Sequence, residues 1–141
     1  MTGCVSRSWQ HVGVVKKRAR RGEVPLPGAA VVIRGDLLDP DILARDAKLN
    51  HGVYGFFGVS VFAETAALAW TDFAETRFSK SRWIVLFTAG DLADAGLELW
   101  DTGAPPHYDV VHADLSELVT RMMGTTHRVL ANPHHDPGGL R

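Results

Sequence analysis

The histidines are the residues that first suggest chemistry in this sequence of 141 residues, which contains seven of them. Helical zinc sites place two histidines at positions i and i+4, and no predicted helix carries such a pair or an HExxH motif. His134 and His135, followed by Asp136, fall in a Pro- and Gly-rich stretch with little to hold ligands rigid. The single cysteine, Cys4, excludes an internal disulfide and a cysteine-based zinc cluster. The sequence therefore predicts no metal site.

Arg34 is a candidate binding residue because it ends a predicted buried strand. A guanidinium there can bind a pyrophosphate or a carboxylate through two parallel hydrogen bonds, which lysine does less well. Tyr54 begins the next predicted strand and could stack on an aromatic ring such as nicotinamide, and Ser60 lies on the same strand. The alternative is a surface arginine at a strand end and a core tyrosine. Motifs for a phosphate loop or a serine nucleophile are absent.

Residues 30–92 resemble the ADP-ribosyltransferase-like fold, including the NAD-degrading toxins of the RES type. The pattern is VVIRG, then YGFFGVSVFAETAALAWTDFAETR, then WIVLFTAGDL. The resemblance implies that Arg34 binds the NAD phosphates, that Tyr54 or Ser60 forms the second-strand element, and that Glu64 matches the glutamate of the RES type. It also implies NAD as substrate, a role as toxin or defence protein, and a protein antitoxin as partner. The sequence has no Ser-Thr-Ser triplet and no Glu-x-Glu motif, so transfer of ADP-ribose to protein is not indicated.

NAD cleavage requires a carboxylate near the ribose, because nicotinamide leaves through an oxocarbenium-like state. Glu64, Asp101 and Asp109 are the candidates, and we assign the catalytic role to Glu64 and Asp109. Each could instead be a helix cap or a solvated strand residue. The predicted activity is that of an NAD glycohydrolase or an ADP-ribosyltransferase-like enzyme, with a small-molecule nucleotide as ligand.

Two other function classes remain open. His107 and His112, with His127 and Arg128, could form a metal-independent ribonuclease site, since in-line attack needs a general base, a general acid and a cation. His107 and His112 are five residues apart on one predicted strand and so point to opposite faces. The third hypothesis is a non-enzymatic interaction domain whose histidines lie at strand edges.

The charge is divided unevenly along the chain. Residues 1–25 carry six basic and one acidic side chains, a net charge of +5, whereas residues 26–141 carry a net charge of −6. The basic segment could contact nucleic acid, or it could be a solvated terminus. We expect a cytoplasmic protein without a membrane partner, because the chain has no long apolar run and no signal peptide. The residues that could contact phosphates are Lys16, Lys17, Arg18, Arg20 and Arg21.

Hydrophobic spacing predicts a single α+β domain with a mixed, mostly antiparallel sheet and three helices. We expect a basic N-terminal tail at 1–27, the domain at 28–131 and a C-terminal tail at 132–141. The run from Trp83 to Phe87 is apolar throughout and predicts a central strand, with Trp83, Ile84, Leu86 and Phe87 among the most buried residues. The other predicted strands are 30–34, 54–62, 97–100, 107–112 and 127–130. The predicted helices begin at Asp39-Pro40, Thr65 and Asp114, and a short helical turn is expected at 90–95.

Overall fold

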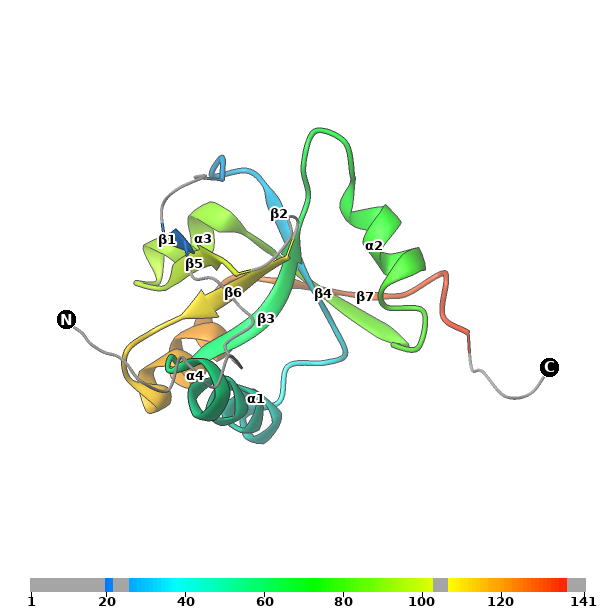
Figure 1. The fold of residues 1–141 in the computed structure, drawn as a ribbon. Coiled ribbons are helices and arrows are strands. Elements are labelled where there is room, and N and C mark those ends of the chain that lie inside the picture. Colours follow the sequence, from blue (N-terminus) through cyan, green and yellow to red (C-terminus); the bar gives the residue numbers. More distant parts are fainter. Residues whose placement is uncertain (1–19, 22–25, 103–106, 137–141) are drawn as a thin grey trace.

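The computed structural model describes residues 20–21, 26–102 and 107–136. They form one antiparallel sheet in the order β1-β5-β6-β3-β2-β4-β7 (Figure 1). The strands are β1 (Arg20–Arg21), β2 (Val31–Gly35), β3 (Gly58–Ala63), β4 (Trp83–Thr88), β5 (Glu98–Asp101), β6 (His107–Val111) and β7 (Arg128–Ala131). The helices are α1 (Pro40–Tyr54), α2 (Trp70–Thr76), α3 (Ala89–Asp94) and α4 (Leu115–Gly124). The predicted α+β class is confirmed.

Two details of the predicted architecture are wrong. The strand pairs of the described residues are all antiparallel, so the sheet is not mixed. The same residues contain four helices and not three, because the turn at 90–95 is a full helix, α3. Its first turn is capped by the Thr88 hydroxyl, which accepts a hydrogen bond from the Asp91 amide at 3.1 Å.

Helix α1 begins as predicted and ends later than predicted. The Asp39 carboxylate accepts hydrogen bonds from the Asp41 and Ile42 amides, and Pro40 is the first helical residue. The helix continues past Gly52 and stops at Gly55, whose φ of 87° is left-handed and whose amide donates to the His51 carbonyl. Tyr54 is therefore the last residue of α1. Its predicted place on the aromatic strand is wrong, because that strand begins only at Gly58.

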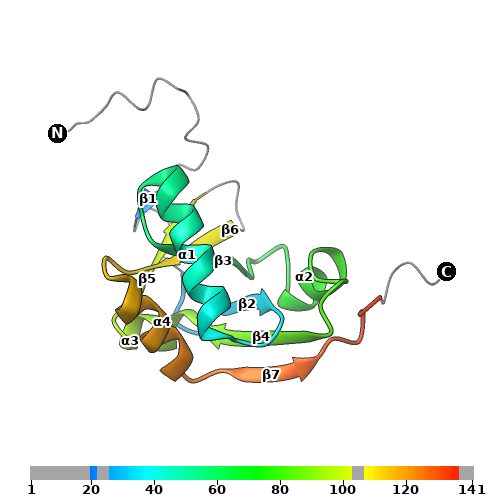
Figure 2. The ribbon, with the colours of Figure 1, turned by 90° about the horizontal axis from the view of Figure 1, so that it is seen from below.

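The side chains of each strand point alternately to the two faces of the sheet, and helices cover both faces. Helices α1 and α4 pack side by side on one face of the sheet, which we call the α1 face (Figure 2). Helix α3 also contributes to the core on this face. Its buried strand residues are Val32, Val59, Val61, Val85, Phe87, Tyr108 and Val110. The opposite α2 face is covered by α2 over β2, β3 and β4, where Ile33, Ile84 and Leu86 pack against Phe73 and Ala74. None of the helices in the described ranges is both long and apolar enough to cross a bilayer.

The central position of β4 is confirmed for three of its four predicted core residues. Ile84, Leu86 and Phe87 are buried. Trp83 is 37% exposed, so its predicted burial is wrong. It is the first residue of β4 and points to the α1 face beside β7, the outermost strand on that side of the sheet.

Ordered structure extends past both predicted tail boundaries. The backbone of Arg20 and Arg21 pairs with Asp101 and Trp100 of β5. At the other end, Asn132 is buried and donates through its side-chain amide to the carbonyls of Ala74, Phe78 and Ser81, at 3.2, 2.9 and 3.1 Å. Asn132 therefore anchors the corner between α2 and β4.

Candidate functional site

A buried polar network lies on the α2 face where β5, β6 and β3 run side by side. Ser60 is directly opposite Asp109, and Trp100 is opposite Asp109 on its other side. The Asp109 carboxylate is fully buried, and it accepts hydrogen bonds from the Ser60 hydroxyl at 3.1 Å and the Thr102 hydroxyl at 2.5 Å. The Thr102 oxygen is also 3.2 Å from Nδ1 of His107. Because this hydroxyl donates its proton to Asp109, it accepts from His107, and the imidazole carries a proton on Nδ1.

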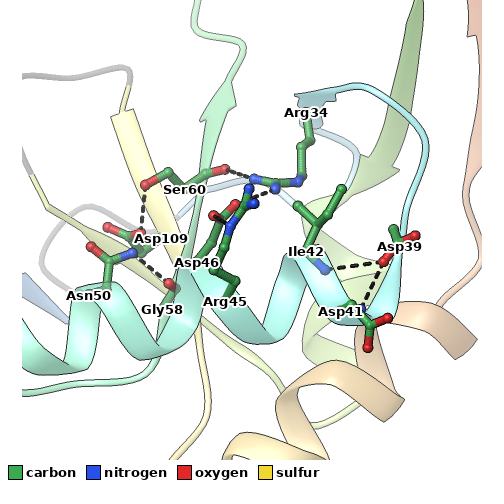
Figure 3. Close-up of polar contacts among 10 residues, drawn as sticks. All are labelled: Arg34, Asp39, Asp41, Ile42, Arg45, Asp46, Asn50, Gly58, Ser60 and Asp109. Carbon is green, nitrogen blue, oxygen red and sulfur yellow. Dashed lines mark hydrogen bonds and ion pairs between the residues drawn. The ribbon is translucent and has the colours of Figure 1, made fainter.

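Arg34 joins this network through the backbone of Ser60 (Figure 3). Its Nη1 donates to the Ser60 carbonyl at 3.1 Å, and its Nη2 donates to the Asp46 carboxylate of α1 at 2.7 Å. The Arg34 side chain is only 14% exposed. The structure thus connects three of the five predicted site residues, Arg34, Ser60 and Asp109. It places the guanidinium against α1, where the bond to Asp46 joins the sheet to the helix and the bond to Ser60 joins β2 to β3.

The other two predicted site residues lie apart from this network. Glu64 follows the C-terminal end of β3, and its carboxylate accepts from the amides of Val31 and Trp70 at 3.2 and 3.4 Å. It therefore links β2 to the start of α2. Tyr54 lies at the C-terminal end of α1, where its ring is 6.4 Å from that of Phe56.

A cleft of about 530 Å³ opens beside the polar network. Phe56 packs over Gly58, where an added Cβ would lie 2.6 Å from the phenylalanine ring and 3.1 Å from the Asp109 Cβ. Both cleft-lining rings are thus neighbours of the network, Phe56 through Gly58 and Trp100 through its pairing with Asp109. The cleft is lined by His51, Gly55, Phe56, Phe57, Gly96, Glu98, Trp100, Val111, His112 and Ala113.

Aromatic rings and one carboxylate determine what this cleft can bind. Phe56 and Trp100 are 5.0 Å apart at an angle of 47°, and His51 stacks on Phe57 at 4.3 Å. The Trp100 indole donates to the Glu98 carboxylate at 2.8 Å, which fixes the indole plane. The Nδ1 atom of His112 accepts a hydrogen bond from the Asp114 amide at 2.9 Å, so the neutral ring carries its proton on Nε2. Such walls favour a flat heterocycle with polar substituents.

The residues of the predicted ribonuclease site do not come together. His107 opens β6 and belongs to the polar network, whereas His112 follows the other end of β6 and lines the cleft. His127 precedes Arg128 of β7, and its Nδ1 donates to the Thr125 carbonyl at 2.6 Å. Strand β7 is separated from β6 by β3, β2 and β4. One substrate phosphate cannot contact all four residues in this arrangement.

Sequence reasoning missed the residues that line the cleft. Glu98 and Trp100 are two positions apart on the predicted strand 97–100, so their side chains lie on the same face of it. This shared face could have been recognised from the sequence. Phe56 lies between Gly55 and Gly58, and glycines within a predicted strand such as 54–62 indicate a close approach to the backbone. The close approach is real at Gly58, but the neighbour is the Phe56 ring itself.

Within the part of the chain that the structure describes, no group of three or more histidine, cysteine or acidic side chains could hold a metal ion. Lys16, Lys17 and Arg18 of the basic segment lie outside the described residues. The fold and site therefore define an antiparallel α+β protein with an aromatic cleft beside a buried carboxylate. Comparisons with protein-family models, curated proteins and solved structures found no match to this chain.

Proposed function

We propose that the protein is an NAD-processing enzyme and that its cleft takes the nicotinamide ring. The observation that carries this proposal is the aromatic lining of the cleft together with the Glu98 carboxylate. Its volume of about 530 Å³ lies within the range of small-molecule and cofactor sites, about 300–1,000 Å³. The sequence resemblance of residues 30–92 to the ADP-ribosyltransferase-like fold supports the same substrate.

The proposed reaction breaks the bond between C1′ of the ribose and the nicotinamide nitrogen. The bonding electrons leave with neutral nicotinamide, and a water oxygen bonds to C1′ as its proton passes to a base. Glu98 is the carboxylate that lines the cleft, so it stabilises the developing positive charge and accepts this proton. The Nε2 proton of His112 is a hydrogen-bond donor for a carbonyl or phosphate oxygen of the substrate.

The residues assigned from the sequence have positioning roles in this proposal. Asp109 is buried opposite Trp100, and it accepts the hydroxyl of Thr102, which directly follows β5, the strand that carries the indole. Arg34 would have to give up its bond to Asp46 to bind a phosphate, so we assign it to holding α1 on the sheet. Glu64 has the same structural character, because both of its oxygens accept backbone amides.

Unrestrained hydrolysis of NAD would deplete a cofactor that the cell needs for its redox reactions. The proposal therefore includes a role as a cytoplasmic toxin or defence protein, with a protein antitoxin as partner. The NAD-degrading toxins of the RES type, to which the sequence shows its resemblance, are the basis for this part of the proposal.

The test is release of nicotinamide from NAD by the full chain, measured by chromatography. We expect Glu98→Gln and Trp100→Ala to lower the rate by about 100-fold or more, as for the loss of a general base or a substrate wall. Glu75→Gln and Trp83→Ala are matched controls, because both residues are exposed and lie outside the cleft. Circular dichroism checks that each variant is folded. Absence of nicotinamide release, or equal activity of Glu98→Gln and Glu75→Gln, would overturn the proposal.

A further inference from the structure

The outer edge of β7 is open in the part of the chain that the structure describes. Strand β7 pairs with β4 on one side, and it is the last strand in the sheet order. Figure 2 shows β7 running along the rim of the sheet, away from α1. Folded proteins usually cover or charge such an edge, because its free amides and carbonyls can pair with another strand.

The hydrogen bonds between β4 and β7 show which backbone groups face outward. The Asn132 amide donates to the Arg82 carbonyl at 2.9 Å, so these two residues form a hydrogen-bonded pair. Hydrogen-bonded pairs alternate along an antiparallel ladder, and the next ones are Leu130 with Ile84 and Arg128 with Leu86. The amides and carbonyls of Val129 and Ala131 therefore point away from β4, toward the open side.

Apolar side chains lie along the same edge. Val129 is 43% exposed and Trp83 is 37% exposed. Val129 is opposite Val85, and Ala131 is opposite Trp83, so these residues share the α1 face. A strand that paired with β7 would place every second side chain beside Val129 and Ala131 on this face.

The charge of the edge selects the partner. Strands β4 and β7 contain no acidic residue, whereas Arg128 is exposed on β7 and Arg82 directly precedes β4. Arg128 is opposite Leu86 and so lies on the α2 face, the other side of the edge from Val129. Two acids lie near the ends of this edge: Asp91 lines a hollow together with Arg128, and the Asp36 amide donates to the Trp83 carbonyl from the β2 side. A second copy of the same edge would bring no acidic side chain to Arg128, whereas an acidic segment would place carboxylates beside it.

We propose that the edge of β7 binds an extended acidic segment of a partner protein, which adds an eighth strand to the sheet. Its apolar side chains lie beside Val129 and Ala131, and its alternating aspartate or glutamate side chains lie on the opposite face, where one of them pairs with Arg128. This interaction surface is separate from the cleft, so it does not depend on the proposed NAD chemistry. Addition of a strand to an exposed edge is a common mode of peptide recognition, in which backbone bonds supply affinity and alternate side chains supply specificity.

The probe is a synthetic peptide of about six residues that alternates valine and glutamate, with both ends blocked. A peptide that alternates valine and lysine is the control. In NMR titrations of the full chain we expect the glutamate peptide to bind at least about tenfold more tightly. The amides of Val129 and Ala131 should then exchange more slowly with solvent, because they donate to the added strand.

Two variants make the test specific. Arg128→Glu should reverse the preference, so that the lysine peptide binds more tightly, and Lys48→Glu on exposed α1 should leave it unchanged. Val129→Pro removes an outward amide without removing a bond to β4, and it should abolish binding of the glutamate peptide. If Val129→Pro does not fold, the peptide preference of Arg128→Glu alone tests the proposal.

Three results would overturn the proposal. The first is binding of neither peptide, and the second is equal affinity for both peptides or an unchanged preference in Arg128→Glu. The third is a dimer in sedimentation experiments that protects the amides of Val129 and Ala131 without any peptide. In that case a second copy of the chain occupies the edge.

Discussion

Trp100 lies directly opposite Asp109 across the β5–β6 strand pair, so an indole that lines the cleft and a fully buried carboxylate share one face of the sheet. Cross-strand neighbours have Cβ atoms about 5 Å apart, which is close enough for a change at one to move the other. The position of the cleft wall therefore depends on the hydrogen bonds that hold Asp109.

Replacement of Asp109 by asparagine tests this dependence. The side-chain amide would place a donor against one of the two donating hydroxyls, Ser60 or Thr102. We expect Asp109→Asn to lower the free energy of unfolding by about 1–3 kcal/mol, measured by urea denaturation. Asp94→Asn, at an exposed position on α3, is the control and should change it by less than about 0.5 kcal/mol. Equal stability of the two variants would contradict a structural role for the network.

The ion pair between Arg34 and Asp46 should stabilise the fold more than a surface pair does. We expect a double-mutant cycle with Arg34→Met and Asp46→Asn to give a coupling energy of about 1–2 kcal/mol, because the guanidinium is mostly buried. The control is Arg121 with Glu117, a more exposed i,i+4 pair, for which about 0.3–0.5 kcal/mol is expected. Similar coupling energies in both cycles would mean that the burial of Arg34 adds nothing.

Strand β4 offers a matched pair of core substitutions. Leu86 is 3% exposed and packs between the sheet and α2, whereas Trp83 is 37% exposed. We expect Leu86→Ala to cost about 2–5 kcal/mol in unfolding free energy and Trp83→Ala to cost about 1 kcal/mol or less. Thermal or chemical denaturation measures both. A larger loss for Trp83→Ala would show that its ring packs more tightly than its exposure indicates.

Tyr108 should make the protein sensitive to alkali. Burial, and then the negative charge of Asp101, raise the pKa of Tyr108 above its ordinary value of 10.0. Above that value the unfolded chain loses the phenol proton while the folded chain keeps it, so stability is full at lower pH and falls as pH rises toward the folded-state pKa. The expected slope is at most about 1.4 kcal/mol per pH unit, and Tyr108→Phe should remove it.

The phenolate absorbance of Tyr108 can be followed by itself in Tyr54→Phe, because the sequence contains two tyrosines. A folded-state titration midpoint at or below about 10 would contradict the raised pKa.

The dispersed histidines distinguish the two enzymatic hypotheses. His107 and Arg128 lie outside the cleft lining, so we expect His107→Ala and Arg128→Ala to keep nicotinamide release within about tenfold of the unmodified chain. Cleavage of RNA that disappears in each variant, with a bell-shaped pH profile near the histidine range, would favour the ribonuclease instead.

Local signals in the sequence predicted the positions of helices and strands better than the contacts between them. The apolar run of β4 and the caps at Asp39 and Asp114 depend on neighbouring residues, and the structure confirms them. Tyr54 was misplaced because its aromatic neighbours favour a strand, whereas a tertiary bond from Asn50 to the Gly58 carbonyl accompanies the longer helix.

The candidate site was predictable only in part. Arg34 was chosen because it ends a predicted buried strand, Ser60 because of its place on the next strand, and Asp109 because NAD cleavage needs a carboxylate. Their connection depends on the sheet order β6-β3-β2, and that order is set by long-range pairing that no local pattern encodes. The choice of Asp46 as the partner of Arg34 depends on where α1 lies on the sheet.

The anchoring of Asn132 has a consequence for the order of folding events. Its side-chain amide reaches carbonyls up to 58 residues earlier in the chain, at the corner between α2 and β4. Closing a loop of that length costs chain entropy before the hydrogen bonds form, and contacts of large sequence separation slow folding. The corner at Ala74, Phe78 and Ser81 therefore cannot be completed by local structure alone, because it needs Asn132 from beyond the end of β7.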